Sequence, residues 1–302
     1  MIKPDEIVES IKQMIGSNSI NLSRLYDCFN SIEPPIIVIP LQIPRGQSII
    51  RVRINTTSNC FDDIGELSYP PSDKSKLMRA SLLGHPMFYG SIYSKTLNPD
   101  GAFPRITTLF ETSDKLRDPN FSGHQIVTFS KWRLIDTIRV FALPISNNYR
   151  EFTYDAINIQ NYWNTLFKPN IEIDRGAFSE YMGDLMAEKG SNSIYEVTAN
   201  FIRYMLDNDE VGYQGIVYPT QQLDGDGFNI ALTPSTVDAN CQLEHASTCI
   251  LIKDKKDATL LGIADAMWDT NGHIRWTPKK EVLMPLLKSH PEIVNTLYFV
   301  DE

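Results

Sequence analysis

Arginine, tyrosine and glutamate side chains interrupt apolar runs in the first part of the chain. Arg51 and Arg53 lie in "QSIIRVRI", Arg79 and Tyr89 lie in "RASLLGHPMFYGS", and Glu111 ends "ITTLFE". An arginine is charged at neutral pH and has two parallel N–H donors, which suit it to phosphate. A tyrosine ring attracts a flat cation, and a carboxylate stabilises positive charge that develops during bond cleavage. These residue types predict a site that an anionic ligand enters.

Common metal and nucleotide motifs do not account for this site. The stretch "DGDGFNIALTPS" starts like a calcium loop, but Phe228 and Ser235 stand at its fifth and twelfth positions, so it predicts a hairpin turn. Cys241, His245 and Cys249 recur every four residues, which on a helix places the outer two about 12 Å apart, too far for one ion. The sequence contains no G-x-S-x-G, Walker or G-x-G-x-x-G motif. We therefore expect no metal site and no resident cofactor.

The elements that must position the charged residues alternate between β-rich and helical blocks. Residues 3–15 have the spacing of an amphipathic helix, which returns in "YWNTLF", "AFSEYMGDLMAE" and "SIYEVTANFIRYMLD". The predicted strands are "QSIIRVRI", "HPMFYGSIYS", "ITTLFE", "GYQGIVYPT", "GFNIALT" and "STCILIKD". Asn271 and Gly272 in "MWDTNGHIRW" predict a hairpin with a type I′ turn. A β-rich start, a helical middle and a β-rich end predict an α+β fold.

Composition excludes several classes of partner. At 302 residues with 42% hydrophobic content, the chain can form one large core, and we expect a single domain with decorations at both ends. Its 37 acidic and 28 basic residues give a net charge of -9, which would repel nucleic acid. The sequence lacks an apolar run of membrane-spanning length, and "MIKPDEIVESIK" does not have the pattern of a secretory signal. We expect a cytoplasmic protein with four free cysteines and no membrane association.

The order of the segments resembles the RES family, which is named for an arginine, a glutamate and a serine. The resemblance spans about residues 48 to 253 and rests on "IRVRI", "ELSYPP", "MRASLLGHPMFYGS", "ITTLFE" and "GYQGIVYPT…GFNIAL". Members of this family are bacterial NAD-consuming proteins, many of them toxins of toxin–antitoxin pairs, with a fold similar to ADP-ribosyltransferases. The resemblance implies a mixed or antiparallel β core with flanking helices, NAD as the substrate, and an antitoxin protein as a candidate partner.

The resemblance also implies roles for seven residues. Glu111 would stabilise the oxocarbenium-like transition state, and Tyr89 would stack on the nicotinamide ring. Arg79, with Arg51 or Arg53, would bind the pyrophosphate. The positions that match the family as catalytic are Glu111, Arg79 and Tyr89, and those that match as substrate-binding are Arg51, Arg53, Thr220 and Asn229.

Three positions depart from the family pattern. Met78 and Ala80 flank the second arginine, where the family usually has a glycine and an aromatic residue. Thr220 follows "YP", where the family typically has a serine. Threonine keeps the hydroxyl but adds a methyl group and a stiffer χ1, so the hydrogen bond can survive in a narrower pocket.

The sequence leaves the acceptor and the partners open. Water would make the protein a NAD glycohydrolase, phosphate a NAD phosphorylase, and a protein side chain an ADP-ribosyltransferase. A catalytically silent module that binds a nucleotide or a partner protein is the alternative from another class. The expected organisation is a helical, Pro-rich extension over residues 1–45, a RES-like domain over 46–255 with a helical insertion near 155–208, and a hairpin and helix over 256–302. The oligomeric state is not predicted.

Overall fold

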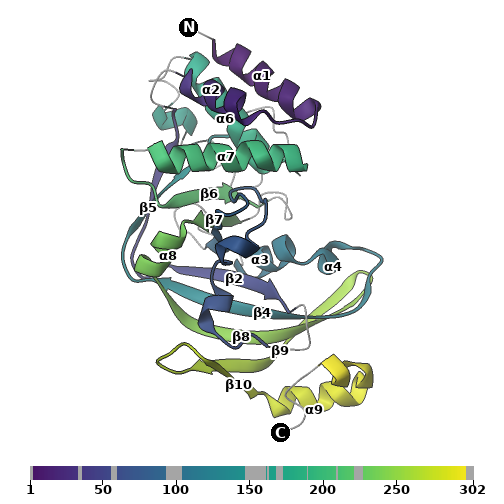
Figure 1. Ribbon diagram of the computed structural model, residues 1–302. Coiled ribbons are helices and arrows are strands. Elements are labelled where there is room, and N and C mark those ends of the chain that lie inside the picture. The colour runs from purple at the N-terminus through teal and green to yellow at the C-terminus, as the bar shows by residue number, and fades with distance from the viewer. Residues whose placement is uncertain are drawn as a thin grey trace.

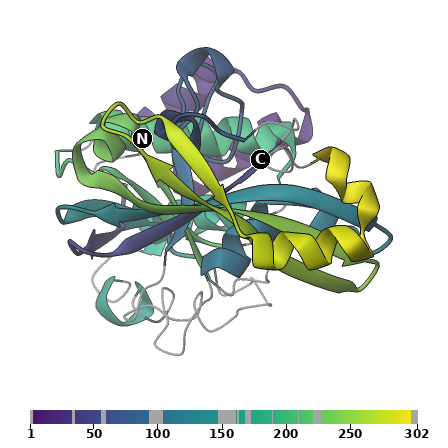
Figure 2. The same ribbon diagram turned by 90° about the horizontal axis from the view of Figure 1, so that it is seen from below.

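A computed structural model gives the fold of the chain. It describes residues 3–32, 36–55, 60–92, 104–146, 161, 163–167, 173–188, 190–208, 210–220 and 227–296. Helices lie over one end of a strongly twisted sheet, and another helix lies against the far end (Figures 1 and 2). The predicted α+β class, with a mixed sheet and flanking helices, is therefore confirmed.

The sheet has ten strands among the described residues, in the order β1-β5-β6-β7-β3-β2-β4-β8-β9-β10. Strands β5 and β6 are parallel, and the other neighbouring strands are antiparallel. The strands are β1 (Ile39–Ile43), β2 (Ser48–Ile54), β3 (Phe88–Ile92), β4 (Ser122–Leu134), β5 (Ile138–Ala142), β6 (Gly215–Pro219), β7 (Phe228–Leu232), β8 (Cys241–Asp254), β9 (Asp257–Trp268) and β10 (Ile274–Pro278). Strands from the predicted N-terminal extension, the central part and the C-terminal extension thus share one sheet.

All but one of the α-helices fall into three groups around this sheet, and the remaining one, α8, lies beside β8. Helices α1, α2, α6 and α7 form a helical layer over β5, β6 and β7, α3 and α4 lie beside β2 and β3, and α9 packs on β9 (Figure 1). The α-helices are α1 (Pro4–Gly16), α2 (Leu22–Asn30), α3 (Pro104–Thr112), α4 (Asp114–Arg117), α6 (Ile173–Ala187), α7 (Asn192–Asn208), α8 (Pro234–Asn240) and α9 (Lys280–Ser289). Shorter helical turns are Ile64–Leu67, Ser72–Lys74, Trp163–Phe167 and Pro291–Thr296.

The helical layer is held by an aromatic core. Phe29, Phe178 and Phe201 are fully buried, and their ring centroids lie 5.5 to 6.5 Å apart in edge-to-face pairs. Such pairs add to the stabilisation from burial of apolar area. Phe141 and Ile216 reach the same cluster from the sheet. The layer and the sheet therefore share one core, which fixes α7 relative to β6.

The prediction of a strand at "ITTLFE" is wrong, because these residues form most of α3. Strand β3, which precedes this segment, is already paired with β2 and β7, and β2 is paired with β3 and β4. Beyond the pairs Ile49–Ile92 and Ile50–Ser91 the two strands diverge, and α3 rather than a further strand lies against them. The segment instead lies against the sheet as a helix that buries Thr107, Thr108 and Leu109.

The hairpin predicted at Asn271 and Gly272 is confirmed, but its turn type is wrong. Strands β9 and β10 pair as expected, and Gly272 has a φ of 88°. A type I′ turn needs positive φ at both central residues, whereas Asn271 keeps a negative φ. The Asp269 carboxylate accepts hydrogen bonds from the backbone N–H groups of Asn271 and His273, which stabilises this alternative turn.

Candidate functional site

The seven predicted site residues come together around one cleft. The cleft has a volume of about 490 Å³ and lies between strands β2, β3 and β7 and helices α3 and α7. The predicted residues that line it are Arg51, Arg53, Arg79, Tyr89, Glu111 and Asn229. The seventh, Thr220, donates a hydrogen bond from its hydroxyl to the Glu111 carboxylate.

The cleft opens where β2 and β3 stop pairing. The last paired residues are Ile50 and Ser91. The next residue of β2 is Arg51, whose Nη1 atom donates a 2.7 Å hydrogen bond to the carbonyl oxygen of Tyr89. A hydrogen bond from a side chain thus replaces the backbone hydrogen bonds between β2 and β3 at this point. Gly90 allows β3 to approach β2 closely here, since a Cβ atom at this position would lie 2.9 Å from the carbonyl oxygen of Ile50.

Arg51 is a cation with an incomplete set of partners. Its guanidinium carbon lies 5.2 Å from the ring centre of Phe88. Burial, together with the nearby charge of Arg53, lowers the pKa of Arg51 to about 9. Its Nε atom is buried and has no hydrogen-bond partner among the described residues. A negative charge in the cleft, which Arg51 lines, would offset the cost of burying this cation.

Arg79 connects the cleft wall to the helical layer. Its side chain is buried, with the residue 8% exposed, and its Nη1 atom donates to the carbonyl oxygens of Met186 and Glu188. Its guanidinium carbon lies 5.3 Å from the ring centre of Tyr195 and 5.9 Å from that of Tyr218. Cation–π contact with two rings holds the guanidinium in one orientation.

Tyr89 anchors the segment that carries Arg79. Its hydroxyl donates to the hydroxyl oxygen of Ser81 at 3.1 Å and accepts from the backbone N–H of Ala80 at 3.0 Å. Burial raises the pKa of Tyr89 to about 12, so the hydroxyl keeps its proton under ordinary conditions. The ring lines the cleft while the hydroxyl is committed to the neighbouring turn.

The acidic end of the cleft is formed by α3, β6 and β7. Glu111 lies in the last turn of α3, and Thr220, which is 2% exposed, follows β6 directly. Asn229 is a ladder residue of β7, opposite Tyr218 on one side and Ser91 on the other, and its Oδ1 atom accepts from the Ser91 hydroxyl at 3.0 Å. A carboxylate and an amide therefore face the same cavity from different elements.

Arg53 differs from Arg51 in its surroundings. Its Nη1 atom donates to the carbonyl oxygen of Glu66, and its guanidinium carbon lies 4.8 Å from the ring centre of Phe61. Burial lowers the pKa of Arg53, while the Glu66 carboxylate raises it. Since the sequence left Arg51 and Arg53 as equal candidates, the unpartnered Nε atom makes Arg51 the better prepared of the two for a ligand.

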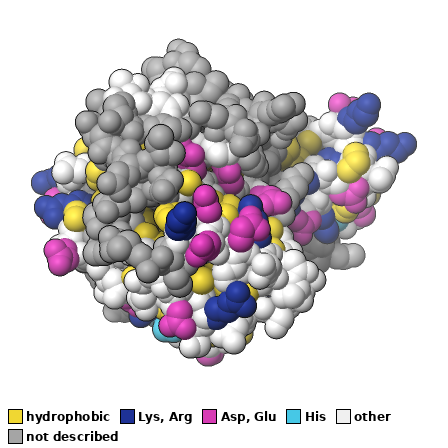
Figure 3. Space-filling model, turned by 90° about the horizontal axis from the view of Figure 1, so that it is seen from above, with side chains coloured by type: hydrophobic (Ala, Val, Ile, Leu, Met, Phe, Trp, Pro, Cys, Tyr) yellow, Lys and Arg dark blue, Asp and Glu magenta, His cyan; other side chains and the backbone are white. Residues whose placement is uncertain are grey.

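The cleft is strongly basic although the protein is acidic. Its described lining contains six cationic side chains against one carboxylate, Glu111, while the whole chain has a net charge of -9. The cationic residues are Arg51, Arg53, Lys74, Lys76, Arg79 and Arg117. On the outside, α1 exposes Asp5, Glu6 and Glu9, and acidic side chains gather on the face viewed in Figure 3. The charge pattern therefore favours an anion in the cleft.

Several charged and aromatic residues that line the cleft, among them Arg117, were not predicted from the sequence. Lys74 and Lys76 are exposed on the segment that precedes Arg79, and Tyr195 lies in the first turn of α7. The helical spacing of residues 192–208 predicts α7 but cannot tell which of its side chains meets a cleft made by distant strands. Lysines in a polar segment carry no comparable signal, because most of them are simply solvated.

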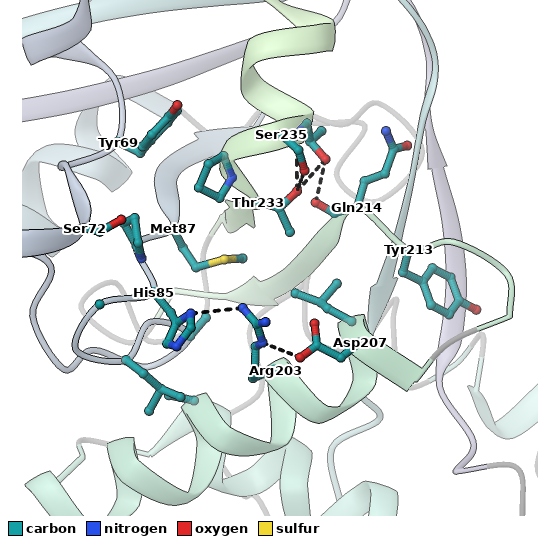
Figure 4. Close-up of a pocket in the computed structure, with 18 of the residues that line it drawn as sticks. Tyr69, Ser72, His85, Met87, Arg203, Asp207, Tyr213, Gln214, Thr233 and Ser235 are labelled. Carbon is teal, nitrogen blue, oxygen red and sulfur yellow. Dashed lines mark hydrogen bonds and ion pairs between the residues drawn. The ribbon is translucent and has the colours of Figure 1, made fainter.

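A second and larger cavity, of about 830 Å³, is shown in Figure 4, and Met87 lines both cavities. Within it, Arg203 of α7 contacts His85 at 3.1 Å and forms an ion pair with Asp207. Ala80 is the residue next to Arg79, and with Met87 it lines the large cavity. The segment between β2 and β3 thus contributes to both cavities, but none of the seven predicted residues lines the larger one.

Other findings bear on cofactors, membranes and relatives. In the part of the chain that the structure describes, no group of three or more His, Cys, Asp or Glu residues could hold a metal ion. None of the helices described is both long and apolar enough to cross a bilayer. The predicted turn with Asp224 and Asp226 lies outside the described residues, although the strands that it joins, β6 and β7, are antiparallel neighbours. No protein-family model matches the chain, and no curated protein matches it.

Proposed function

We propose that the cleft binds NAD and cleaves its nicotinamide–ribose bond, which would make the protein a NAD glycohydrolase or a NAD phosphorylase. One observation carries this proposal: seven residues selected from separate segments by their order meet around a single cavity. The excess of cations over carboxylates in the lining also suits a ligand with a pyrophosphate. Under this proposal the sheet and its helices form an ADP-ribosyltransferase-like fold.

The cationic wall is where we place the pyrophosphate. Arg51 lines the cleft and has a pKa lowered by burial, so a phosphate group there would supply the counter-charge that the guanidinium lacks. Arg79 is held on the same wall by the backbone of α6 and by two tyrosine rings. A rigid cation loses little conformational freedom when the ligand binds, which favours affinity.

The acidic end is where we place the ribose. Cleavage breaks the bond between C1′ of the ribose and the nicotinamide nitrogen, and the electron pair leaves with the nicotinamide. Positive charge then develops on the ribose, and the Glu111 carboxylate would stabilise it. The acceptor donates an electron pair to C1′ and loses a proton. Water or phosphate would serve a glycohydrolase or phosphorylase, and a protein side chain would make the same site an ADP-ribosyltransferase.

The test is release of nicotinamide from NAD by the purified protein, with and without phosphate. Glu111→Gln is compared with Glu281→Gln, the same change at an exposed position of α9. Release by wild type and Glu281→Gln, with little release by Glu111→Gln, supports the proposal. Tight binding of NAD without release would identify a silent nucleotide-binding module, and neither binding nor release would refute the proposal.

The toxin role is a separate part of the proposal, with its own test. Depletion of cellular NAD and arrest of growth are expected when wild-type protein is expressed in bacteria, and Glu111→Gln should abolish both. An antitoxin would then be sought as a protein that restores growth when it is expressed together with the wild type. Growth at the normal rate with full expression of active wild-type enzyme would contradict a toxin role.

A further inference from the structure

The helical layer contributes a side chain to the cleft. Tyr195 of α7 lines the cavity together with Tyr218 of β6. The two rings lie 5.3 Å and 5.9 Å from the guanidinium carbon of Arg79. The arginine is therefore flanked by one aromatic residue from the sheet and one from a helix outside it.

The same arginine also caps a helix of that layer. Helix α6 ends at Ala187, and the carbonyl oxygens of Met186 and Glu188 both accept from the Nη1 atom of Arg79. The last carbonyl groups of a helix lack partners within the helix and carry partial negative charge. A cation placed there satisfies them, so Arg79 is bound to α6 and α7 at once.

The connection between these two helices packs directly on the Tyr195 ring. A Cβ atom at Gly190 would lie 2.2 Å from the Cε1 atom of Tyr195, which is far inside contact distance. The backbone at Gly190 therefore leaves no space behind the ring. The ring therefore contacts both this backbone and the guanidinium of Arg79.

From these contacts we infer that Tyr195 is a positioning residue for the anion site, acting through Arg79, and that the helical layer is part of the ligand site. The identity of the ligand as NAD rests on the proposed function. The positioning itself does not depend on the reaction, because any ligand with a pyrophosphate meets the same guanidinium. Loss of the ring should weaken binding and leave the rate of the bound complex nearly unchanged.

The experiment compares Tyr195→Leu, Tyr195→Phe and Tyr181→Leu. Tyr181 is the matched control, because it lies on α6 with its ring 5.8 Å from the Lys12 ammonium but does not line the cleft. Calorimetry gives Kd for NAD and for inorganic pyrophosphate, and nicotinamide release gives KM and kcat. Tyr195→Leu should raise Kd and KM by about 3- to 30-fold with kcat within about twofold, as expected for loss of a cation–π contact. Tyr195→Phe keeps the ring and should bind like wild type.

Gly190→Ala is a second way to disturb the contact between Tyr195 and Arg79. The added Cβ atom would displace the Tyr195 ring without removing it, so this variant should also bind NAD and pyrophosphate more weakly. Thermal melts establish that each variant is folded. Equal affinity of wild type and both perturbing variants would overturn the inference, as would an equal loss in Tyr181→Leu. Absence of pyrophosphate binding in the wild type would overturn it too. If the wild type neither binds nor cleaves NAD, but pyrophosphate binds the wild type and binds the two perturbing variants more weakly, the proposed function fails and the inference stands.

Discussion

The hydroxyl of Thr220 donates a hydrogen bond to the Glu111 carboxylate, which lies 109 residues earlier in the chain. Thr220 is 2% exposed and its backbone N–H donates to the carbonyl of Gly227 at 3.0 Å, so the donor is fixed between the end of β6 and the start of β7. The acceptor is carried by the end of α3. The contact therefore orients the carboxylate toward the cleft from two independent elements.

Removal of the Thr220 hydroxyl should lower activity more than removal of its methyl group. Thr220→Val is nearly isosteric but leaves the carboxylate without this donor, at a cost of about 1 to 3 kcal/mol. We expect nicotinamide release to fall by about 10-fold or more in Thr220→Val, whereas Thr220→Ser keeps the donor and should equal or exceed wild type. Steady-state release of nicotinamide measures both. Unchanged activity in Thr220→Val would mean that the hydroxyl is dispensable.

Glu111→Gln should separate catalysis from binding. The amide keeps the shape of the side chain and can still accept a hydrogen bond from Thr220, but it loses the charge. Because that charge acts mainly in the transition state, release should fall at least about 100-fold while NAD affinity changes much less. Single-turnover release and calorimetry measure the two quantities. A parallel loss in both would assign Glu111 to ground-state binding instead.

NAD binding should weaken as the pH rises through about 9. Burial lowers the pKa of Arg51 to about 9 in the protein without ligand. A bound phosphate favours the charged form and raises this pKa, so binding takes up a proton near and above that pH. Arg51→Met should bind NAD more weakly at neutral pH and should lose this pH dependence. Calorimetric Kd values for NAD at about pH 7.5 and about pH 9.5, for wild type and Arg51→Met, test this prediction. A wild-type affinity that is the same at both pH values would exclude Arg51 as the titrating contact.

Tyr89→Phe should destabilise the segment that carries Arg79. The substitution removes the hydroxyl that bonds to Ser81 and Ala80. The Ser81 hydroxyl still donates to the carbonyl oxygen of Lys76, so the Ala80 N–H is the group that loses its partner, at a cost of about 1 to 3 kcal/mol. We expect the free energy of unfolding to fall by about 1 to 3 kcal/mol in urea denaturation. Tyr204→Phe on α7 is the control, with an expected change below about 0.5 kcal/mol. A Tyr89 variant as stable as this control would contradict the anchoring role.

Local sequence pattern determined much of the fold. The three-and-four spacing of apolar residues predicted α1, α6 and α7, because a helix buries one face whatever lies beneath it. Alternating and β-branched runs predicted β2, β3, β6 and β7 for a similar reason. The order of these segments also selected the seven residues that meet at the cleft.

Contacts between distant segments decided what the local pattern could not. The β-branched run before Glu111 is helical because burial of Thr107, Thr108 and Leu109 against β2 and β3 outweighs its local strand propensity. Pro40 is tolerated in β1, which the Pro-rich stretch did not predict, because that strand lies at the edge of the sheet. Tyr195 entered the cleft because the shared aromatic core places α7 over β6. Each of these outcomes depends on contacts between segments that are far apart in the sequence. Local pattern does not specify such contacts, because they form only when the whole chain is folded.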